Sequence, residues 1–595
     1  MITHPSEPAV ACNPLDITYR FQDLRPLGAE RTVHREAADP SVVRYRDRYF
    51  LFASMSGGFW HSDDLRAWTY QRSTRLPPMD YAPDVREIDG ALYVSASRTT
   101  DSPYFRSENP LEDDFTEVNP GFPFWDPHLF QDDDGATYFY WGCSNKEPLQ
   151  GVQVNSHALE LIGTPVALIS GAPDDHGWEK IGENYVKAEP KTEREKFLAD
   201  YLGDAPFIEG AWMTKHEGSY YFQYAAPGTE WNTYADGYYT GPSPLGPFDY
   251  SPHSPFSSKP GGFITAAGHG STFSDAYGNW WHASTMRISV NHSFERRIGI
   301  FPAGFDDDGV LFCNQNFADY PHIIPEGPVD PWTETFRGWM LQSYRATATA
   351  SSSVPGHEPH LTVDEDIRTW WVAGSSDPGE WVVLDLHGER TVHAIQINLA
   401  DHDLARWAPE LTDGQQFPGE YRGLYHGTRP TEFRIETSLD GERWDTALST
   451  MDTAQETPHA FAALSVPKQA QFVRFTAGTM PFGAPAAVSG IRVFGHGGGD
   501  APEQVRVQAE RISPLTAELS WDAAATAQGY NVRYGIAPDK LYHSWLVYDQ
   551  TRLSLPNLNA GVDYWVAVDP FNESGITEGS TVPIVVAETQ ERSAS

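Results

Sequence analysis

One motif recurs five times in the first half of the chain and limits the folds that this sequence can adopt. Each copy begins with a polar residue, continues through a short apolar strand and a turn rich in Asp, Gly or Arg, and ends in an aromatic second strand. Further strand-like segments follow each copy, so a full unit contains about four strands. The copies occupy residues 38–54, 82–97, 125–142, 208–225 and 268–285.

The residues that open the five copies are four acids and one histidine. They are Asp39, Asp84, Asp126, Glu209 and His269, spaced 45, 42, 83 and 60 positions apart. The first two intervals match one four-stranded propeller blade of roughly 40 to 50 residues. The long third interval contains the clearest helical pattern, "KTEREKFLADYL" at 191–202. Five such units predict a five-bladed β-propeller over residues 31–325.

Propeller geometry predicts that the opening residues meet. The first strand of each blade lines the central axis, so its first residue lies at one mouth of the channel. For any single opener, the alternative is an ordinary turn-forming Asp-Pro or Asp-Gly, but five openers at one repeat position favour a shared site. The loops after the second strands reach the same mouth and carry aromatic and charged groups suited to sugar hydroxyls. These loops span 54–59, 98–104, 143–149, 227–236 and 286–297.

Carboxylates facing one another across a site can hydrolyse glycosidic bonds. One acts as general acid on the leaving oxygen, and the other activates water or attacks carbon directly. A third carboxylate near the acid would raise its pKa by like-charge repulsion and keep it protonated near neutral pH.

The openers lie in motifs that resemble glycoside hydrolase family 43. The motifs are "ADPSV" at 38–42, "APDV" at 82–85, "WDPHLFQDDDG" at 125–135, "EGAW" at 209–212 and "GHGS" at 268–271. The resemblance covers about residues 30 to 325. It implies a five-bladed propeller that hydrolyses glycosidic bonds with inversion and needs no cofactor for the chemistry.

The resemblance also implies roles for individual residues. Asp39 matches the general base that activates water, Glu209 the general acid, and Asp126 the residue that tunes and orients the acid. His269 matches a histidine near the propeller axis that in many members helps to hold a water-ligated ion, often calcium. Arg287 resembles a substrate-contacting arginine.

Asp84 is expected to contact substrate without an assigned step, and its alternative is a turn carboxylate that caps local backbone.

Longer stretches, among them "YAAPGTEWNTYADGYY" and "RISVNHSFERRIGIFPAGFD", resemble a multidomain branch of exo-acting furanosidases. The expected function is therefore release of terminal furanosyl residues by a β-D-galactofuranosidase or an α-L-arabinofuranosidase. A β-xylosidase or an endo-arabinanase of the same fold is the alternative. The alternative from another class is a sugar-binding propeller without catalysis.

The rest of the chain predicts two more β-domains, so the whole protein is expected to be all-β. Residues 1–30 are a lead-in and 326–340 a linker. Residues 341–497 resemble a discoidin-type β-sandwich of the carbohydrate-binding-module type, in which Trp370 and Trp371 could form a sugar platform. Residues 501–588 resemble a fibronectin type III β-sandwich, with Trp521 in its core and Tyr564 at a tyrosine corner.

Charge and composition narrow the class of partner. The 81 acidic and 42 basic residues give a formal charge of −39, which argues against nucleic acid and anionic membranes and suits a neutral polysaccharide or oligosaccharide. The three cysteines are too few and scattered for a disulfide framework or a zinc site. No run of 18 apolar residues and no signal peptide is visible. The protein is expected to be secreted or periplasmic if a signal peptide was removed and cytoplasmic otherwise; no pattern indicates an oligomeric state.

Overall fold

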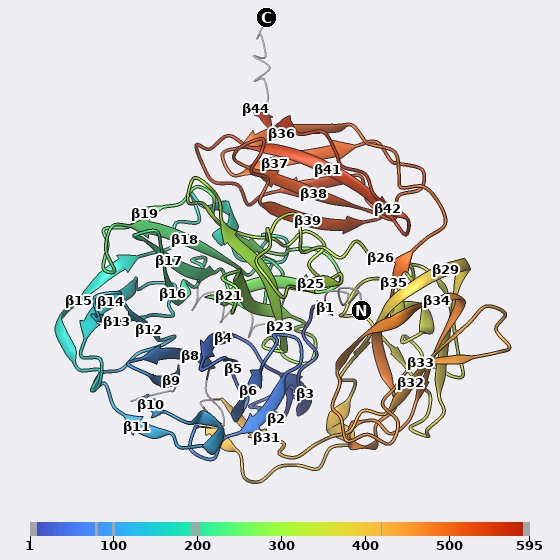
Figure 1. The fold of residues 1–595 in the computed structure, drawn as a ribbon, viewed down its shortest axis with the longest axis horizontal. Helices are drawn as coiled ribbons and strands as arrows, with labels where there is room; N and C mark the ends of the chain where they lie inside the picture. Colours follow the sequence, from blue (N-terminus) through green and yellow to red (C-terminus); the bar gives the residue numbers. More distant parts are fainter. Residues whose placement is uncertain are drawn as a thin grey trace, which may run out of the picture.

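The computed structural model describes residues 9–77, 81–97, 102–191, 196, 203–417 and 419–586. The fold is all-β, as predicted (Figure 1). The helix predicted at 191–202 lies almost wholly outside the described residues. Within the described ranges, no helix is long and apolar enough to cross a membrane.

Five four-stranded antiparallel units surround one axis in the described chain and form the predicted five-bladed propeller. The first strands are β4 (Ser41–Tyr45), β8 (Tyr81–Ile88), β12 (His128–Gln131), β16 (Glu209–His216) and β21 (Thr265–Ser274). The second strands are β5 (Arg48–Phe52), β9 (Ala91–Ser97), β13 (Thr137–Trp141), β17 (Ser219–Ala226) and β22 (Trp280–Arg287). The third strands are β6 (Gly58–Ser62), β10 (Tyr104–Ser107), β14 (Leu149–Val154), β18 (Ala235–Gly241) and β23 (Arg296–Phe305). The fourth strands are β7 (Thr69–Arg72), β11 (Thr116–Val118), β15 (Leu161–Ile169), β19 (Asp249–Tyr250) and β24 (Leu311–Cys313).

Hydrogen bonds between neighbouring inner strands close the ring. At four of the five interfaces, a side chain near the start of one inner strand accepts from a backbone N–H of another blade, at 2.8 to 3.1 Å. The pairs are Ser41 with Val85, Asp84 with Leu129, His128 with Met213, and Ser271 with Val42. At the fifth interface, the indole of Trp212 donates to the carbonyl of Thr272 at 3.2 Å. The last blade is thereby bonded to the first, which fixes the inner strands around the axis.

The middle region is built on one large sheet. Its strands run in the order β26-β35-β29-β34-β32-β33, with β27 and β28 at its side. Their bounds are β26 (Met340–Leu341), β27 (Thr347–Ala350), β28 (Trp371–Val372), β29 (Trp381–Leu399), β32 (Phe433–Ser438), β33 (Asp445–Ser449), β34 (His459–Ala477) and β35 (Ala487–His496). Trp371 is fully buried in the core of this region, whereas Trp370 is partly exposed and stacks on His357. Of the two tryptophans, only Trp370 is therefore available for the predicted sugar contact.

An excursion from the middle region reaches the N-terminal strands. β30 (Gln415–Phe417) and β31 (Glu420–Leu424) join β2 (Arg20–Pro26) and β3 (Thr32–Glu36) in one sheet, in the order β3-β2-β31-β30. Residues 1–30 were predicted to be a lead-in. Their described part instead forms strands that pair with distant segments, because β1 (Ala9–Ala11) also pairs with β25 (His322–Ile324). Pairing with β31 covers an edge of β2 that would otherwise be free.

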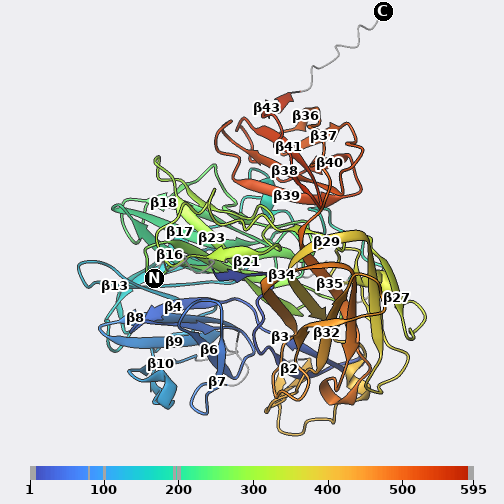
Figure 2. The same ribbon diagram turned by 45° about the vertical axis from the view of Figure 1, so that its right-hand side comes forward.

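The C-terminal region consists of two sheets, β40-β37-β36-β44 and β39-β38-β41-β42, with β43 beside β41 (Figure 2). Their strands are β36 (Val507–Ser513), β37 (Thr516–Trp521), β38 (Gly529–Gly535), β39 (His543–Tyr548), β40 (Arg552–Leu555), β41 (Trp565–Asn572), β42 (Gly575–Ile576), β43 (Val582–Pro583) and β44 (Val585–Val586). Trp521 packs in the core against Tyr530. The hydroxyl of Tyr564 accepts a hydrogen bond from the backbone of Asn559, a few residues upstream, as a tyrosine corner requires.

Candidate active site

The backbone at the start of each inner strand has one unusual conformation. Five residues have a positive φ: Asp39 (50°), Ala82 (45°), Asp126 (46°), Gly210 (63°) and His269 (48°). Apart from Gly, residues with φ above zero are uncommon, and Asp and His are enriched among them. The recurrence of Asp and His therefore has a conformational cause as well as a chemical one. It also shows that the openers are not all equivalent, because Asp84 lies two residues beyond the special position and Glu209 one residue before it.

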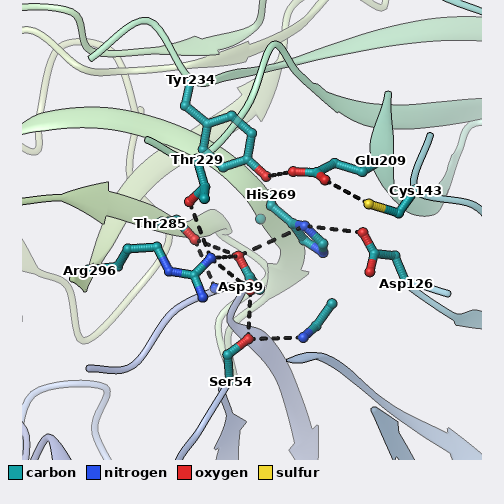
Figure 3. Close-up of polar contacts among 12 residues, drawn as sticks. Asp39, Ser54, Asp126, Cys143, Glu209, Thr229, Tyr234, His269, Thr285 and Arg296 are labelled. Atoms are coloured by element: carbon teal, nitrogen blue, oxygen red, sulfur yellow. Dashed lines mark hydrogen bonds and ion pairs between the residues drawn. The ribbon is translucent and has the colours of Figure 1, made fainter. Parts of the chain in front are cut away.

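Asp39, Asp126, Glu209 and His269 converge at the propeller axis and form what we call the axial cluster (Figure 3). The Nδ1 atom of His269 lies 3.9 Å from Oδ1 of Asp39 and 3.8 Å from Oδ2 of Asp126. Ligand atoms of Asp126 and Glu209 lie within 4.8 Å of each other and of the Cys143 thiol. The structure thus brings together the three carboxylates that the sequence predicted to be catalytic.

Asp39 is held as a carboxylate. It is 5% exposed, and Nη1 of Arg296 donates to both of its oxygens at 3.0 and 3.1 Å. The hydroxyls of Ser54 and Thr285 donate to it at 2.6 and 3.2 Å. Burial opposes ionisation, but Arg296, His269 and the two hydroxyls outweigh it, so the pKa of Asp39 is lowered. This carboxylate is ready to accept a proton from water.

Asp126 has the opposite environment. It is 6% exposed, and the recorded polar contacts of its oxygens are the Ser97 hydroxyl at 3.1 Å and the distant ring of His269. Burial raises the pKa of Asp126 to about 7; His269 opposes this effect, and the charges of Glu209 and Asp39 add to it. Asp126 therefore holds a proton up to about pH 7, close beside Glu209.

Glu209 is partly exposed and is held at both oxygens. The Tyr234 hydroxyl donates to Oε1, and the Cys143 thiol donates to Oε2 at 3.1 Å. Tyr234 comes from the mouth loop after β17, and Cys143 from the mouth loop after β13. Two donors from different blades fix the direction in which this carboxyl group points.

His269 is positioned by a buried aspartate that sequence reasoning did not single out. Asp236 accepts from the backbone N–H of His269 at 2.7 Å and of Gly270 at 3.0 Å, and it contacts Nε2 of His282 at 2.9 Å. Burial lowers the pKa of His269, but Asp39, Asp126, Glu209 and Asp236 outweigh it, so the net pKa is raised. The ring therefore adds positive charge between two carboxylates.

The axial cluster offers calcium few direct protein ligands, so the ion predicted near His269 would be held through water. Calcium takes about six to eight oxygen ligands. The described side chains that are close enough to share one ion are Asp126, Cys143 and Glu209, and a thiol favours softer metals. The oxygens near Nδ1 of His269 belong to Asp39 and Asp126, whose pKa shifts suit proton transfer instead. No step is assigned to an ion.

Asp84 and Arg287, which were predicted to contact substrate, lie outside the axial cluster. Asp84 is 1% exposed and bonds to the backbone of Leu129, the Tyr104 hydroxyl and the His128 ring, so it ties two blades together and does not face substrate. It matches the alternative reading of a carboxylate that caps backbone.

Arg287 is 3% exposed and pairs with Glu183 at 2.6 Å. The arginine at the catalytic carboxylates is Arg296. It follows Glu295 in the "ERR" at the end of the last mouth loop, which was the available signal for it.

A cavity of about 1050 Å³ lies away from the axial cluster. It runs between β7, the N-terminal segment and the middle region, and Trp68, Tyr70, Arg20 and Glu456 are among its lining residues. None of the blade-opening residues borders it. We place the chemistry at the axial cluster because opposed carboxylates with contrasting pKa values meet there at the starts of the inner strands.

Comparisons with known proteins identify relatives of the propeller. Residues 31–311 match the family model for Glycosyl hydrolases family 43. The chain is 26% identical over 279 residues to Beta-D-galactofuranosidase xynD of Aspergillus niger, which covers 40% of this chain and 69% of that protein. It is 27% identical over 261 residues to Xylosidase/arabinosidase 43A of Humicola insolens, covering 39% and 73%. A solved structure titled "Crystal structure of a thermostable family-43 glycoside hydrolase" aligns with a TM-score of 0.40 at 22% identity, over 54% of this chain and 99% of that one. The propeller thus matches the model of glycosyl hydrolases family 43, and the chain is a glycoside hydrolase that acts on O-glycosyl bonds.

Proposed function

We propose that the protein is an inverting, exo-acting glycosidase that releases terminal furanosyl residues from a neutral polysaccharide or oligosaccharide. The observation that carries the mechanism is the contrast between Asp39, which Arg296 keeps ionised, and Asp126, which keeps a proton beside Glu209. The names of the relatives, a galactofuranosidase and a xylosidase/arabinosidase, support a furanoside. They leave β-D-galactofuranose and α-L-arabinofuranose as the two candidates, with a β-xyloside or an internal arabinan linkage as the alternative.

In this mechanism each residue has one task. Asp39 accepts a proton from a water molecule whose oxygen attacks the anomeric carbon. Glu209 donates its proton to the leaving oxygen as the glycosidic bond breaks, so the sugar leaves with inverted configuration. Asp126, which holds a proton of its own up to about pH 7, lies beside the acid, and Tyr234 with Cys143 keeps the acid aimed at the leaving group. One proton enters the protein and one leaves it in each turnover.

The test compares Glu209→Gln and Asp39→Asn with wild type on furanosides and β-xylosides that have good and poor leaving groups. Glu209→Gln should lose about 10²- to 10⁴-fold in kcat/KM on natural linkages and much less on dinitrophenyl glycosides, which leave without protonation. Asp39→Asn should lose activity on both kinds of substrate, because water activation is needed in each case. Wild-type products followed by NMR should have inverted anomeric configuration.

Two results would overturn the proposal. Glu209→Gln activity within threefold of wild type on natural linkages would remove Glu209 as the acid. Sugar binding by wild type without turnover of any glycoside or polysaccharide would favour a binding propeller. Circular dichroism of each variant confirms that the fold is intact.

A further inference from the structure

The middle region places a buried arginine behind the catalytic base. Leu24 of β2 pairs with Arg422 of β31, so the excursion brings this side chain to the N-terminal strands. Arg422 is 1% exposed, and its guanidinium lies 5.4 Å from the ring centre of Tyr81, at the start of the inner strand of the second blade. A residue from outside the propeller is therefore built into the wall beside the axial cluster.

Four charged side chains form a row of alternating sign that ends at the base. Arg296 donates through Nη1 to Asp39 and through Nη2 to Oε1 of Glu36 at 2.8 Å. Oε2 of Glu36 accepts from Gln22 at 2.9 Å and lies 3.7 Å from Nη1 of Arg422. Glu36 is fully buried and Arg296 is 3% exposed, so solvent screens these charges weakly.

Hydrogen bonding alone does not explain why the guanidinium of Arg422 is buried. Its Nη2 pairs with Glu420 at 2.9 Å, but its Nε and Nη1 have no hydrogen-bond partner among the described residues. Burying unmatched donors is costly, and a purely structural arginine would use its fork of donors more fully. What the guanidinium does supply is positive charge next to a buried carboxylate.

Other titratable groups nearby do not supply that charge. His34 and His292 face Arg422 across the N-terminal sheet and the last mouth loop. Burial lowers the pKa of both rings, and Arg422 adds to the effect, so His292 has a pKa of about 4 and both are neutral at working pH. Tyr81 remains a neutral phenol because burial raises its pKa.

We infer that Arg422 is a positioning residue for the catalytic base: by balancing Glu36, it leaves the charge of Arg296 to Asp39. This inference rests on the proposed role of Asp39. Without Arg422, the row gains one net negative charge, and Asp39 holds its proton more tightly. Because the base must be ionised, the acidic limb of the pH profile would move to higher pH. The middle region is thus part of the catalytic apparatus.

The experiment uses the full-length chain and the furanoside that wild type cleaves best. Arg422→Met, which removes charge but keeps an apolar stem, should move the acidic limb of kcat/KM upward by about 0.5 to 1 pH unit, as expected for a unit charge at this range in a partly screened interior. Arg422→Lys should restore most of the shift. Arg406→Met is the matched control, because Arg406 lies in the same excursion with a side chain 79% exposed, and its profile should follow wild type.

Glu36→Gln removes a negative charge from the row and should therefore shift the acidic limb in the opposite direction. Alone it should move the acidic limb to lower pH, and combined with Arg422→Met it should return the limb toward the wild-type position. If Arg422→Met does not fold, two other profiles still test the inference. The row of charges requires the acidic limb to move to lower pH in Glu36→Gln and to stay near the wild-type position in Arg422→Lys.

The inference is overturned if the Arg422→Met and Glu36→Gln profiles both superimpose on wild type, or if activity in these two variants falls equally at every pH. Failure of the proposed function would look different, because wild type itself would then cleave no furanoside or Asp39→Asn would remain active.

Discussion

The middle and C-terminal regions both pack against the propeller, but they do so with different chemistry. The interface of the middle region contains buried charged side chains among its apolar contacts. Arg35 beside Glu36 pairs with Asp401 at 2.6 Å, and Arg297 donates to Nε2 of His459 at 2.9 Å. The C-terminal region has a core that is continuous with that of the fourth blade through Trp178, Tyr185 and Leu558, and its ion pairs to the propeller, from Lys540 to Asp306 and Asp308, lie outside that core.

The difference follows from what lies behind each interface. Behind the ionic interface are Glu36, Arg296 and the base Asp39, so a change of charge there is felt at the reacting groups. Behind the apolar interface lie the packed second and third strands of the fourth blade. We therefore expect damage to the first interface to change both catalysis and stability, and damage to the second to change stability alone.

The strongest way to test this comparison is Asp401→Asn. It leaves Arg35 buried without its carboxylate partner, and breaking such a pair costs about 3–5 kcal/mol of folding free energy. Because Arg35 precedes Glu36 in β3, kcat/KM should also fall. Denaturant unfolding and steady-state kinetics measure the two effects. Asp413→Asn, at an exposed position of the same region, is the control. Lost stability with unchanged kinetics would remove the distinction between the interfaces.

Trp545→Ala tests the apolar interface between the C-terminal region and the propeller. Trp545 is 6% exposed and packs over Gly261, where an added Cβ would lie 2.6 Å from its ring, and edge-on to Tyr185. Its truncation should cost about 3–5 kcal/mol and leave kcat/KM unchanged below the unfolding temperature. Trp407→Ala, at a side chain 42% exposed, should have little effect on stability. A change in kcat/KM of Trp545→Ala would contradict the assignment.

Tyr250→Phe tests the interface of the C-terminal region with a smaller change in the side chain. The Tyr250 hydroxyl accepts from the Trp178 indole and donates to Oδ1 of Asn559, both at 2.9 Å. Removing it leaves two buried polar groups without their partner, at about 1–3 kcal/mol. Thermal unfolding should show the loss, while the pH profile of activity should not move.

The effect of Asp16→Asn depends on pH and should vanish in acid. Asp16 accepts from the backbone N–H of His459 at 3.2 Å, and burial raises the pKa of Asp16 to about 7, against the smaller effects of that N–H and of Arg35. The native state therefore holds a proton that the unfolded chain releases near pH 4, so the group lowers stability progressively from about pH 4 to 7. The Asn variant should gain melting temperature at pH 8 and not at pH 4. An equal gain at both would exclude a titration effect.

Much of the site could be predicted because its residues occupy similar positions in a structural repeat. Propeller geometry requires the starts of inner strands to meet, and so Asp39, Asp126, Glu209 and His269 could be placed together from spacing alone. Asp84 was misplaced because the letters "PD" mimic an opener, whereas the positive φ that defines the position falls on Ala82. Sequence letters do not reveal a two-residue offset inside a bulged strand.

The charge row behind Asp39 could not be predicted. Glu36, Arg296 and Arg422 come from three separate regions, and no local period links them. The choice of Arg287 over Arg296 failed for a related reason. Both lie near the last mouth loop, and their roles differ because Arg287 pairs with Glu183 whereas Arg296 contacts Asp39.

The pairing of β2 with β31 also has a consequence for synthesis. Leu24 and its partner Arg422 are separated by about 400 residues. A ribosome adds about 5–20 residues per second, so the edge of β2 waits roughly 20 to 80 seconds before its partner strand exists. Until then the propeller can close its ring, but the row of charges behind Asp39 is incomplete. The nascent chain therefore acquires its shape before it acquires a fully tuned base.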